Sequence, residues 1–330
     1  MRTIATAAAP TRVKIIAMKA LITGITGMIG LHCAHAAREA GWETVGIARS
    51  SASSRLAAIE DSSVIRCDMM DFPAMEEVFR SAKPDVVIHM AAQAFNGTSW
   101  QIESSTHQAN FIGTANVLRC CRTVVPHAKV LVACSSAEYG DVKPEDCPLK
   151  EDRLLRPISP YGVTKVATEA LGFQYFHNFG LQVYLPRLFI HVGTGHPPAT
   201  AIQNFARQLA LIAKGRLSPE VRVGNLQTAR DFIDVRDGVA AMMMLLAKGP
   251  AGQPVNICTG EAVSIQQVLE MLIEISGQKV TVIPDPKLVR PSDEPLLLGD
   301  NSKLKSLGWS RKYSIRQTLE AVYADWLARI

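Results

Sequence analysis

The sequence lacks an apolar run long enough to cross a bilayer. The run at 240–247, AAMMMLLA, falls far short of the roughly 20 residues that a membrane-spanning helix needs. Hydrophobic residues still make up 48% of the 330 positions, and the mean hydropathy is +0.10. We therefore expect no membrane association and a packed core rather than a disordered chain, in one large domain or two closely packed ones.

Dense clusters of basic residues are also missing. The net charge is only +5, and the lysines and arginines are spread along the chain. This distribution argues against a nucleic-acid partner, whereas a modest positive charge suits an anionic small-molecule ligand.

Paired cysteines and metal-ligand spacings are absent as well. The seven cysteines are odd in number and mostly lie in apolar runs, so we expect reduced core thiols and a cytoplasmic location. Cys120 and Cys121 have no second pair to complete a zinc site, and His32 and His35 have no carboxylate beside them. The sequence therefore predicts no bound metal.

Residues 1–17 contain basic residues but no acidic residue. A poorly ordered extension is the interpretation we favour for them. A transit peptide and a translation start at Met18 stay open as alternatives.

Strand-like apolar runs alternate with helical segments in the first half of the chain. This alternation predicts parallel βαβ units and therefore an α/β fold with a doubly wound parallel sheet. The expected strands are 19–23, 43–48, 63–67, 85–91, 129–134 and 181–185, and the expected helices are 28–40, 72–82, 101–124 and 160–179.

The pattern changes after Gly193, where helices are separated only by short strands. We interpret 18–190 as the sheet domain and 191–330 as a smaller mixed α/β lobe, some of whose segments return to the sheet domain. The helices expected in this part are 202–214, 235–248, 264–276 and 314–328, and the strands are 221–224, 255–258 and 280–283.

A glycine-rich loop joins the first strand to the first helix. Its sequence, GITGMIG at 24–30, places three glycines between a buried strand and a helix N-terminus. Backbone amides and the positive end of the helix dipole favour negative charge there, which suits the pyrophosphate of a dinucleotide. A structural turn rich in glycine is the alternative. The cofactor-binding residues expected here are Gly24, Thr26, Gly27, Met28, Ile29 and Gly30.

The end of the second strand lacks the acidic residue that holds the ribose 2′-hydroxyl of NAD. The chain reads Ala48-Arg49-Ser50 at that point, and an arginine there can pair with a 2′-phosphate. Arg49 and Ser50 are therefore candidate cofactor-binding residues, and Arg55 is a second candidate arginine. We expect NADP(H) to be favoured over NAD(H), with an ordinary solvated arginine as the alternative for Arg49.

Tyr161 and Lys165 lie four residues apart at the start of a predicted helix, so they share one face. A nearby ammonium group stabilises phenolate, which suits Tyr161 to proton transfer, and Lys165 can also hold a ribose hydroxyl. Ser135 and Ser136 end the fifth strand at the carboxyl edge of the sheet, where a hydroxyl can bond a reacting oxygen. A strand-end turn is the alternative for Ser135. The expected catalytic residues are Ser135, Tyr161 and Lys165.

With these motifs, the chain from residue 18 onward resembles the extended short-chain dehydrogenase/reductase family. The resemblance rests on the glycine loop, the run HMAAQ at 89–93, the serine pair and the tyrosine–lysine pair. The segments 223–237 and 290–309 are similar to the branch of GDP-mannose 4,6-dehydratases and GDP-4-keto-6-deoxymannose reductases. The resemblance implies a Rossmann-type NAD(P)-binding domain at 18–190 and a nucleotide-sugar-binding lobe at 191–330.

The resemblance also implies roles for single residues. Arg230 and Arg290 should grip the diphosphate of a nucleotide sugar, with surface salt bridges as the alternative. Asp68 should accept a hydrogen bond from the adenine amino group, and Asn110 should lie below Lys165. The other implied cofactor-binding residues are Met69, Ala91, Ala92, Gln93, Asn110 and Leu188, and the other implied substrate-binding residues are Ser136, Asn204 and Val223.

Two departures from the family pattern bear on the reaction. Dehydratases carry a Thr-Asp-Glu or Thr-Ser-Glu run after the fifth strand, and its glutamate removes a proton. Here the run is Ser135-Ser136-Ala137, and on an extended strand Glu138 would point to the other side unless a turn redirects it. Ile190 stands where the branch usually has asparagine, which leaves the identity of the sugar open.

The resulting hypothesis is an NADP(H)-dependent reductase of a GDP-linked 4-keto-6-deoxyhexose that gives GDP-rhamnose or its 4-epimer. A nucleotide-sugar 4-epimerase, a dehydratase that uses Glu138 or another acid, and a non-catalytic NADP sensor are the alternatives. The predicted helices near 101–124 and 159–179 are apolar on more than one face, so we expect a homodimer through a four-helix bundle, as in family members.

Overall fold

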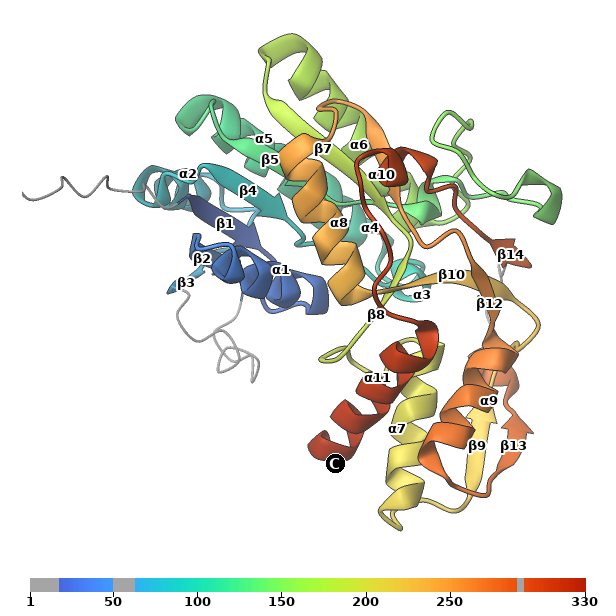
Figure 1. Ribbon diagram of the computed structural model, residues 1–330. Coiled ribbons are helices and arrows are strands. Elements are labelled where there is room, and N and C mark those ends of the chain that lie inside the picture. The colour runs from blue at the N-terminus through green and yellow to red at the C-terminus, as the bar shows by residue number, and fades with distance from the viewer. Residues whose placement is uncertain (1–17, 50–62, 290–293) are drawn as a thin grey trace, which may run out of the picture.

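The computed structural model describes residues 18–49, 63–289 and 294–330, and Figure 1 shows their arrangement. A parallel sheet forms the centre of the molecule. Its strands are β1 (Lys19–Thr23), β2 (Glu43–Ala48), β3 (Ser63–Arg66), β4 (Val86–His89), β5 (Lys129–Val132), β6 (Cys134–Ser135), β7 (Gln182–Leu188) and β11 (Pro254–Ile257). The predicted extension at 1–17 and the candidate residues Ser50, Arg55 and Arg290 lie outside the described residues.

The strands follow the order β11–β7–β5–β4–β1–β2–β3, and β6 pairs with β7. Every pairing in this sheet is parallel, so the predicted doubly wound parallel sheet is confirmed. The strand order reverses between β1 and β4: β2 and β3 follow on one side of β1, and β4 and β5 follow on its other side. In such sheets, ligands bind beyond the carboxyl ends of the strands at this switch point.

Helices cover both faces of the sheet and bury two separate apolar layers. On one face, α1 (Met28–Glu39) and α8 (Val235–Lys248) pack against the aliphatic side chains of β1, β4 and β11. On the other face, α2 (Phe72–Ala82), α5 (Gly113–Val124) and α6 (Pro160–Phe179) enclose the second layer. The strands are buried on both sides, which explains their continuous apolar sequences.

Helix α6 carries its start and stop signals in the sequence. Ser159 precedes it, and its hydroxyl accepts a hydrogen bond from the Gly162 N–H at 3.1 Å, while Pro160 occupies the first turn. Gly180 ends the helix in the left-handed region at φ +69°. These signals place α6 where the sequence predicted it.

The predicted helix at 101–124 is interrupted in the structure. It consists of α4 (Glu103–His107), a π-helical turn η2 (Gln108–Ile112) and α5, which follow each other directly. The π-turn shifts the helical register near Asn110, and such turns occur often at functional sites. A further short helix, α3 (Asn96–Ser99), precedes this group.

The C-terminal part forms a smaller lobe, seen below the sheet in Figure 1. Its helices α7 (Ala201–Ala213), α9 (Ile265–Ser276) and α11 (Ile315–Arg329) share one apolar core. The strand β10 (Ala229–Asp234) pairs with β8 (Ile190–Val192), β12 (Ala262–Ser264) and β14 (Leu296–Leu297). This part also contains the strand pair β9 (Glu220–Val223) and β13 (Thr281–Pro284), the 3₁₀ turn η5 (Pro286–Leu288) and the short helix α10 (Ser302–Ser306).

The sequence patterns missed β8, β10, β12 and β14. These strands are short or occur directly beside polar motifs, so their alternation is weak, and they are defined by pairing between distant segments. The short helix α10 was missed as well. The four longer helices after residue 193 and the strands β9, β11 and β13 were predicted within one or two residues of their ends.

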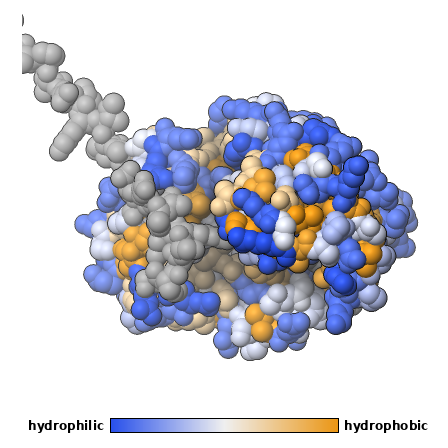
Figure 2. Space-filling model, turned by 90° about the horizontal axis from the view of Figure 1, so that it is seen from below, coloured by the Kyte–Doolittle hydropathy of each residue, from blue (hydrophilic) through white to orange (hydrophobic). Residues whose placement is uncertain are grey.

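In the described residues, no helix combines the length and apolarity that crossing a membrane requires. The face drawn in Figure 2 is largely hydrophilic, and polar side chains break up its apolar areas. All seven cysteines are free thiols, and six of them are buried, as the sequence predicted.

Candidate active site

The glycine loop brings β1, β4 and the start of α1 into close contact. Gly24 has φ +68°, and a Cβ there would lie 2.7 Å from the backbone nitrogen of Ala91. A Cβ on Gly30 would collide with the carbonyl oxygen of Gly24. The first turn of α1 contains no acidic residue and has no side-chain cap, so its positive end is available to an anion. This bare backbone cradle fits a pyrophosphate.

A buried hydrogen-bonded chain lies directly beneath the loop. The Thr23 hydroxyl bonds Nδ1 of His89 at 2.7 Å, and Nε2 of His89 bonds the Thr114 hydroxyl at 2.9 Å. The Ala91 N–H donates to the Thr23 hydroxyl at 3.2 Å. Burial, together with the charge of Lys165, lowers the pKa of His89 to about 3, so this imidazole is neutral at pH 7. These hydrogen bonds hold the end of β4 against β1.

Asn110 ties this region to the helix that carries the predicted catalytic pair. Its Oδ1 accepts the Gln93 N–H at 2.7 Å, and its amide donates to Gln93 O at 3.1 Å and to the Thr164 hydroxyl at 3.0 Å. Asn110 is therefore bonded to the residue that precedes Lys165 on α6. Its place below Lys165 and its contact with a cofactor stay predictions.

Tyr161 and Lys165 lie in the first two turns of α6. The Lys165 ammonium is buried, donates to Ala133 O at 2.6 Å and lies 5.8 Å from the centre of the Tyr161 ring. The Tyr161 N–H donates to the Ser99 hydroxyl at 3.3 Å. The spacing in the sequence therefore produces the expected pair on one side of the helix.

Ser135 reaches the same place from the sheet. It ends β6 directly beside Leu188 of β7, and a 3₁₀ turn, η3 (Ser136–Glu138), follows it. The Ser135 hydroxyl accepts the Ala137 N–H at 3.2 Å, and both Ser135 and Ser136 are buried. Parallel pairing thus brings together residues that lie 53 positions apart in the chain.

These residues open into a cavity of about 740 Å³ between the sheet domain and the smaller lobe. A volume of this size suits a drug-sized or larger ligand. The cavity collects predicted residues from six distant segments. The predicted site residues that line it are Met28, Ile29, Ser135, Ser136, Tyr161, Leu188, Asn204 and Arg230.

Arg230 enters the cavity from β10, which the sequence analysis did not predict as a strand. Its guanidinium donates to Glu294 O at 2.6 Å and lies 3.6 Å from the Glu294 carboxylate. Lys287 lines the same cavity and was missed, because it lies in a segment rich in proline with no regular pattern. Among the described residues, Arg230 and Lys287 thus place two cationic side chains on the lobe side of the cavity.

Several predicted residues do not line this cavity among the residues that the structure describes. Arg49 and Asp68 are exposed and follow the ends of β2 and β3. The strand β2 lies beside β1, which leads into the glycine loop, and β3 lies beside β2. Val223 is buried in the core of the lobe, and its neighbour Gly224 lines the cavity instead. The others are Gly24, Thr26, Gly27, Gly30, Met69, Ala91, Ala92, Gln93, Asn110 and Lys165, and their contacts with a ligand stay predictions.

Glu138 is turned away from the cavity. The strand ends at Ser135 and a 3₁₀ turn follows, and this turn does not bring Glu138 to the cavity. The side chain is nevertheless fully buried on the far side of the turn, where Oε1 accepts the Ser135 N–H at 2.7 Å. Ala137, which the resemblance aligns with the dehydratase glutamate, lines the cavity.

The fold and this residue set define the class of the protein. A doubly wound sheet with a glycine loop at its switch point, and a serine, a tyrosine and a lysine beside one cavity, form a short-chain dehydrogenase/reductase architecture. The chain matches the family model described as GDP-mannose 4,6 dehydratase over residues 21–322, and it belongs to this family. The resemblance stated from the sequence is confirmed.

Individual relatives extend this assignment. The GDP-6-deoxy-D-mannose reductase of Pseudomonas aeruginosa is 28% identical over 94% of this chain and 97% of its own length. The structure of RMD from P. aeruginosa complexed with NADPH superposes with a TM-score of 0.83 at 27% identity, covering 95% of this chain and all of that one. The UDP-glucose 4-epimerase of Thermus thermophilus in complex with NAD has a TM-score of 0.85 at 26% identity over the same shares.

Proposed function

We propose that this protein is a nucleotide-sugar reductase that uses NADP(H) to reduce a GDP-linked 4-keto-6-deoxyhexose to GDP-rhamnose or its 4-epimer. The observation that carries the proposal is the composition of the cavity wall after β6. Hydroxyl groups of Ser135 and Ser136 are present there, but Ala137 has no group that moves a proton and Glu138 faces away. This wall suits carbonyl reduction better than elimination of water.

Each residue of the set has a task in such a reduction. When bound, the reduced nicotinamide supplies a hydride to C4 of the keto sugar. Tyr161 gives its phenolic proton to the carbonyl oxygen, which becomes the new hydroxyl group. Ser135 donates a hydrogen bond to the same oxygen and orients it, and the buried Lys165 ammonium favours the phenolate left on Tyr161.

The nucleotide would bind across the cavity towards the lobe. Arg230 and Lys287 supply positive charge for its diphosphate, and Arg290 is proposed as a third contact. Asn204, on α7, is suited to hydrogen-bond a sugar or base. The cavity of about 740 Å³ is large enough to take more than the sugar alone.

The preference for NADP(H) is part of the proposal. Arg49 is exposed at the end of β2 and can pair with a 2′-phosphate, and the P. aeruginosa structure contains NADPH, whereas the T. thermophilus epimerase contains NAD. We further propose a cytoplasmic location, because the seven thiols are unpaired and mostly buried.

The decisive assay follows NADPH absorbance with purified protein and GDP-4-keto-6-deoxymannose. Decay of the absorbance together with a GDP-6-deoxyhexose product supports the reductase, and the same assay with NADH measures the cofactor preference as a ratio of kcat/KM. A parallel incubation with GDP-mannose and NADP⁺ tests elimination. A 4-keto product in that incubation would contradict the reductase proposal and assign a dehydratase.

A nucleotide-sugar 4-epimerase is the second candidate. The same serine, tyrosine and lysine serve it, and the similarity to a UDP-glucose 4-epimerase favours it. An epimerase would retain tightly bound cofactor and interconvert two sugars without a net change in NADPH absorbance. Product analysis of a GDP- or UDP-hexose incubated without added cofactor separates the two candidates.

A further inference from the structure

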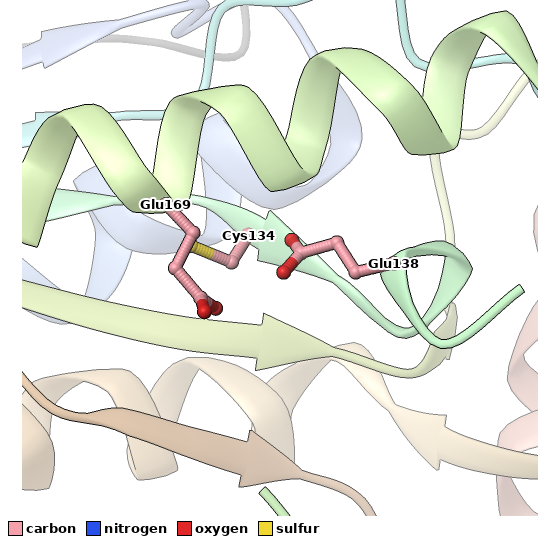
Figure 3. Close-up of side chains that lie close together, drawn as sticks. All are labelled: Cys134, Glu138 and Glu169. Atoms are coloured by element: carbon pink, nitrogen blue, oxygen red, sulfur yellow. The ribbon is translucent and has the colours of Figure 1, made fainter. Parts of the chain in front are cut away.

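The buried carboxyl group of Glu138, the largely buried one of Glu169 and one guanidinium meet behind the active-site turn. Figure 3 shows that Glu138 and Glu169 direct their carboxyl groups to the same space beside Cys134. The ligand atoms of these three residues lie within 4.8 Å of one another. Glu138 is fully buried, and only 12% of the Glu169 side chain is exposed.

The cation that contacts both carboxyl groups is Arg187. Its guanidinium donates two hydrogen bonds to Glu169, at 2.7 and 2.8 Å, and its Nε lies 3.5 Å from Oε2 of Glu138. A third bond runs from Arg187 to Glu151 O at 3.0 Å. Because the guanidinium already contacts both carboxyl groups, a metal ion at this point would have to displace it.

One face of this cluster holds the backbone of Ser135. Oε1 of Glu138 accepts the Ser135 N–H at 2.7 Å, while the Ser135 hydroxyl accepts the Ala137 N–H at 3.2 Å. These two bonds form a reciprocal capping box around a turn of only three residues. The orientation of the serine at the cavity wall therefore depends on an acceptor at position 138.

Glu169 and Arg187 connect the cluster to the two other elements that form the active site, α6 and β7. Glu169 lies one helical turn after Lys165 on α6, and Arg187 directly precedes Leu188 on β7. Arg187 is also paired in register with Cys134, as Leu188 is with Ser135. The cluster consequently joins the three elements that carry the serine, the tyrosine–lysine pair and Leu188.

The charges of the cluster favour a neutral Glu138. Burial, and then the nearby carboxylate of Glu169, raise the pKa of Glu138 well above its ordinary value, although Arg187 opposes this. A neutral Glu138 adds no negative charge to the pair that Arg187 forms with Glu169. Glu138 can thus remain buried as a hydrogen-bond acceptor without adding an uncompensated charge.

We propose that Glu138 is a positioning residue for the reduction, acting through Ser135 by fixing the turn that presents the serine hydroxyl to the substrate oxygen. This inference rests on the proposed function, since it assigns how one residue of that site is held. It also accounts for a glutamate one position after Ala137 that does not reach the cavity, because its carboxyl group accepts the Ser135 N–H and lies beside Arg187.

The test compares Glu138→Leu with Glu138→Gln. Leucine removes the acceptor but leaves the Arg187–Glu169 pair balanced, so the protein is expected to fold. Glutamine keeps an oxygen that can accept the Ser135 N–H. We expect Glu138→Leu to lower kcat about 10-fold or more, with KM for the keto sugar and Kd for NADPH within about 3-fold, because the serine bond strengthens in the transition state. Glu138→Gln should restore kcat to within about 3-fold of the wild type.

A double-mutant cycle and a matched control complete the test. If Glu138 acts through Ser135, adding Glu138→Leu to the Ser135→Ala variant should lower kcat by less than about a further 2-fold. The control is Asp237→Asn, which removes another buried carboxylate that accepts backbone N–H groups, at 3.0 and 3.1 Å, and that does not line the cavity. It is expected to lower the melting temperature without changing kcat.

The outcomes separate this proposal from the function on which it rests. Equal loss in the leucine and glutamine variants, an unchanged kcat in Glu138→Leu, or additive losses in the cycle would each overturn the positioning role. If the wild type turns over none of the sugars, the proposed function fails, and amide hydrogen exchange of the 134–140 segment still decides the structural claim. Faster exchange in Glu138→Leu than in Glu138→Gln supports it, and equal exchange in the two variants refutes it.

Discussion

Tyr161 is the residue on which the proposed reduction depends most directly. The buried Lys165 ammonium lies 5.8 Å from the centre of its ring, and the tyrosine lines the cavity while the lysine does not. This arrangement suits the two residues to different tasks in the proposed reduction. Tyr161 would contact the reacting sugar, and Lys165 would act from behind it.

Tyr161→Phe should lower kcat by about 100-fold or more, because general acid catalysis contributes about 10²–10⁴-fold and phenylalanine has no proton to give. The ring still fills its place, so the Kd for NADPH, measured by fluorescence titration, should stay within about 2-fold. Turnover equal to that of the wild type would refute the assignment of Tyr161 as the acid.

At the scale of elements, His89 connects β1, β4 and α5. Its ring bonds the hydroxyls of Thr23 and Thr114, and its pKa is lowered to about 3 by burial. The unfolded chain binds a proton at this histidine below about pH 6.5, whereas the native state does so only near pH 3. His191, with its pKa lowered to about 4, acts in the same direction.

The free energy of unfolding should therefore fall as the pH falls from about 6.5 towards 4, with His89 alone contributing about 1 kcal/mol per pH unit. Urea unfolding at pH 7, 6 and 5 measures this slope. His89→Gln should reduce this slope by the amount that the uptake of one proton contributes, about 1 kcal/mol per pH unit. The control His127→Gln, at an exposed position, should leave it unchanged, and equal slopes in all three proteins would contradict this account.

For the whole molecule, the open question is assembly. The π-turn η2 and the helices α5 and α6 pack side by side, and this region carries exposed apolar side chains. Ile112 is 42% exposed and Phe173 is 50% exposed. Covering them with the same region of a second copy would produce the four-helix bundle that the sequence predicts.

Sedimentation velocity should therefore find a dimer, and Phe173→Arg should shift the protein towards the monomer, because a charge would be buried in the interface. Leu217→Arg is a matched control, since Leu217 is similarly exposed, at 44%, in the loop before β9. A wild-type monomer mass at every concentration would refute the dimer.

The sequence by itself determined the features that depend on neighbours along the chain. The alternation of strands and helices, the glycine loop with its helix and the four-residue spacing of Tyr161 and Lys165 all follow from local pattern and backbone geometry. They were enough to predict the doubly wound sheet and its family.

Only the tertiary structure decided what each side chain faces. Arg230 reaches the cavity because β10 pairs with strands from three distant segments, and Ser135 lies beside Leu188 because β6 and β7 are in register. Glu138 is directed to Arg187 by a turn after β6. Such contacts join residues far apart in the chain, and their geometry is set by packing and hydrogen bonding that no local pattern contains.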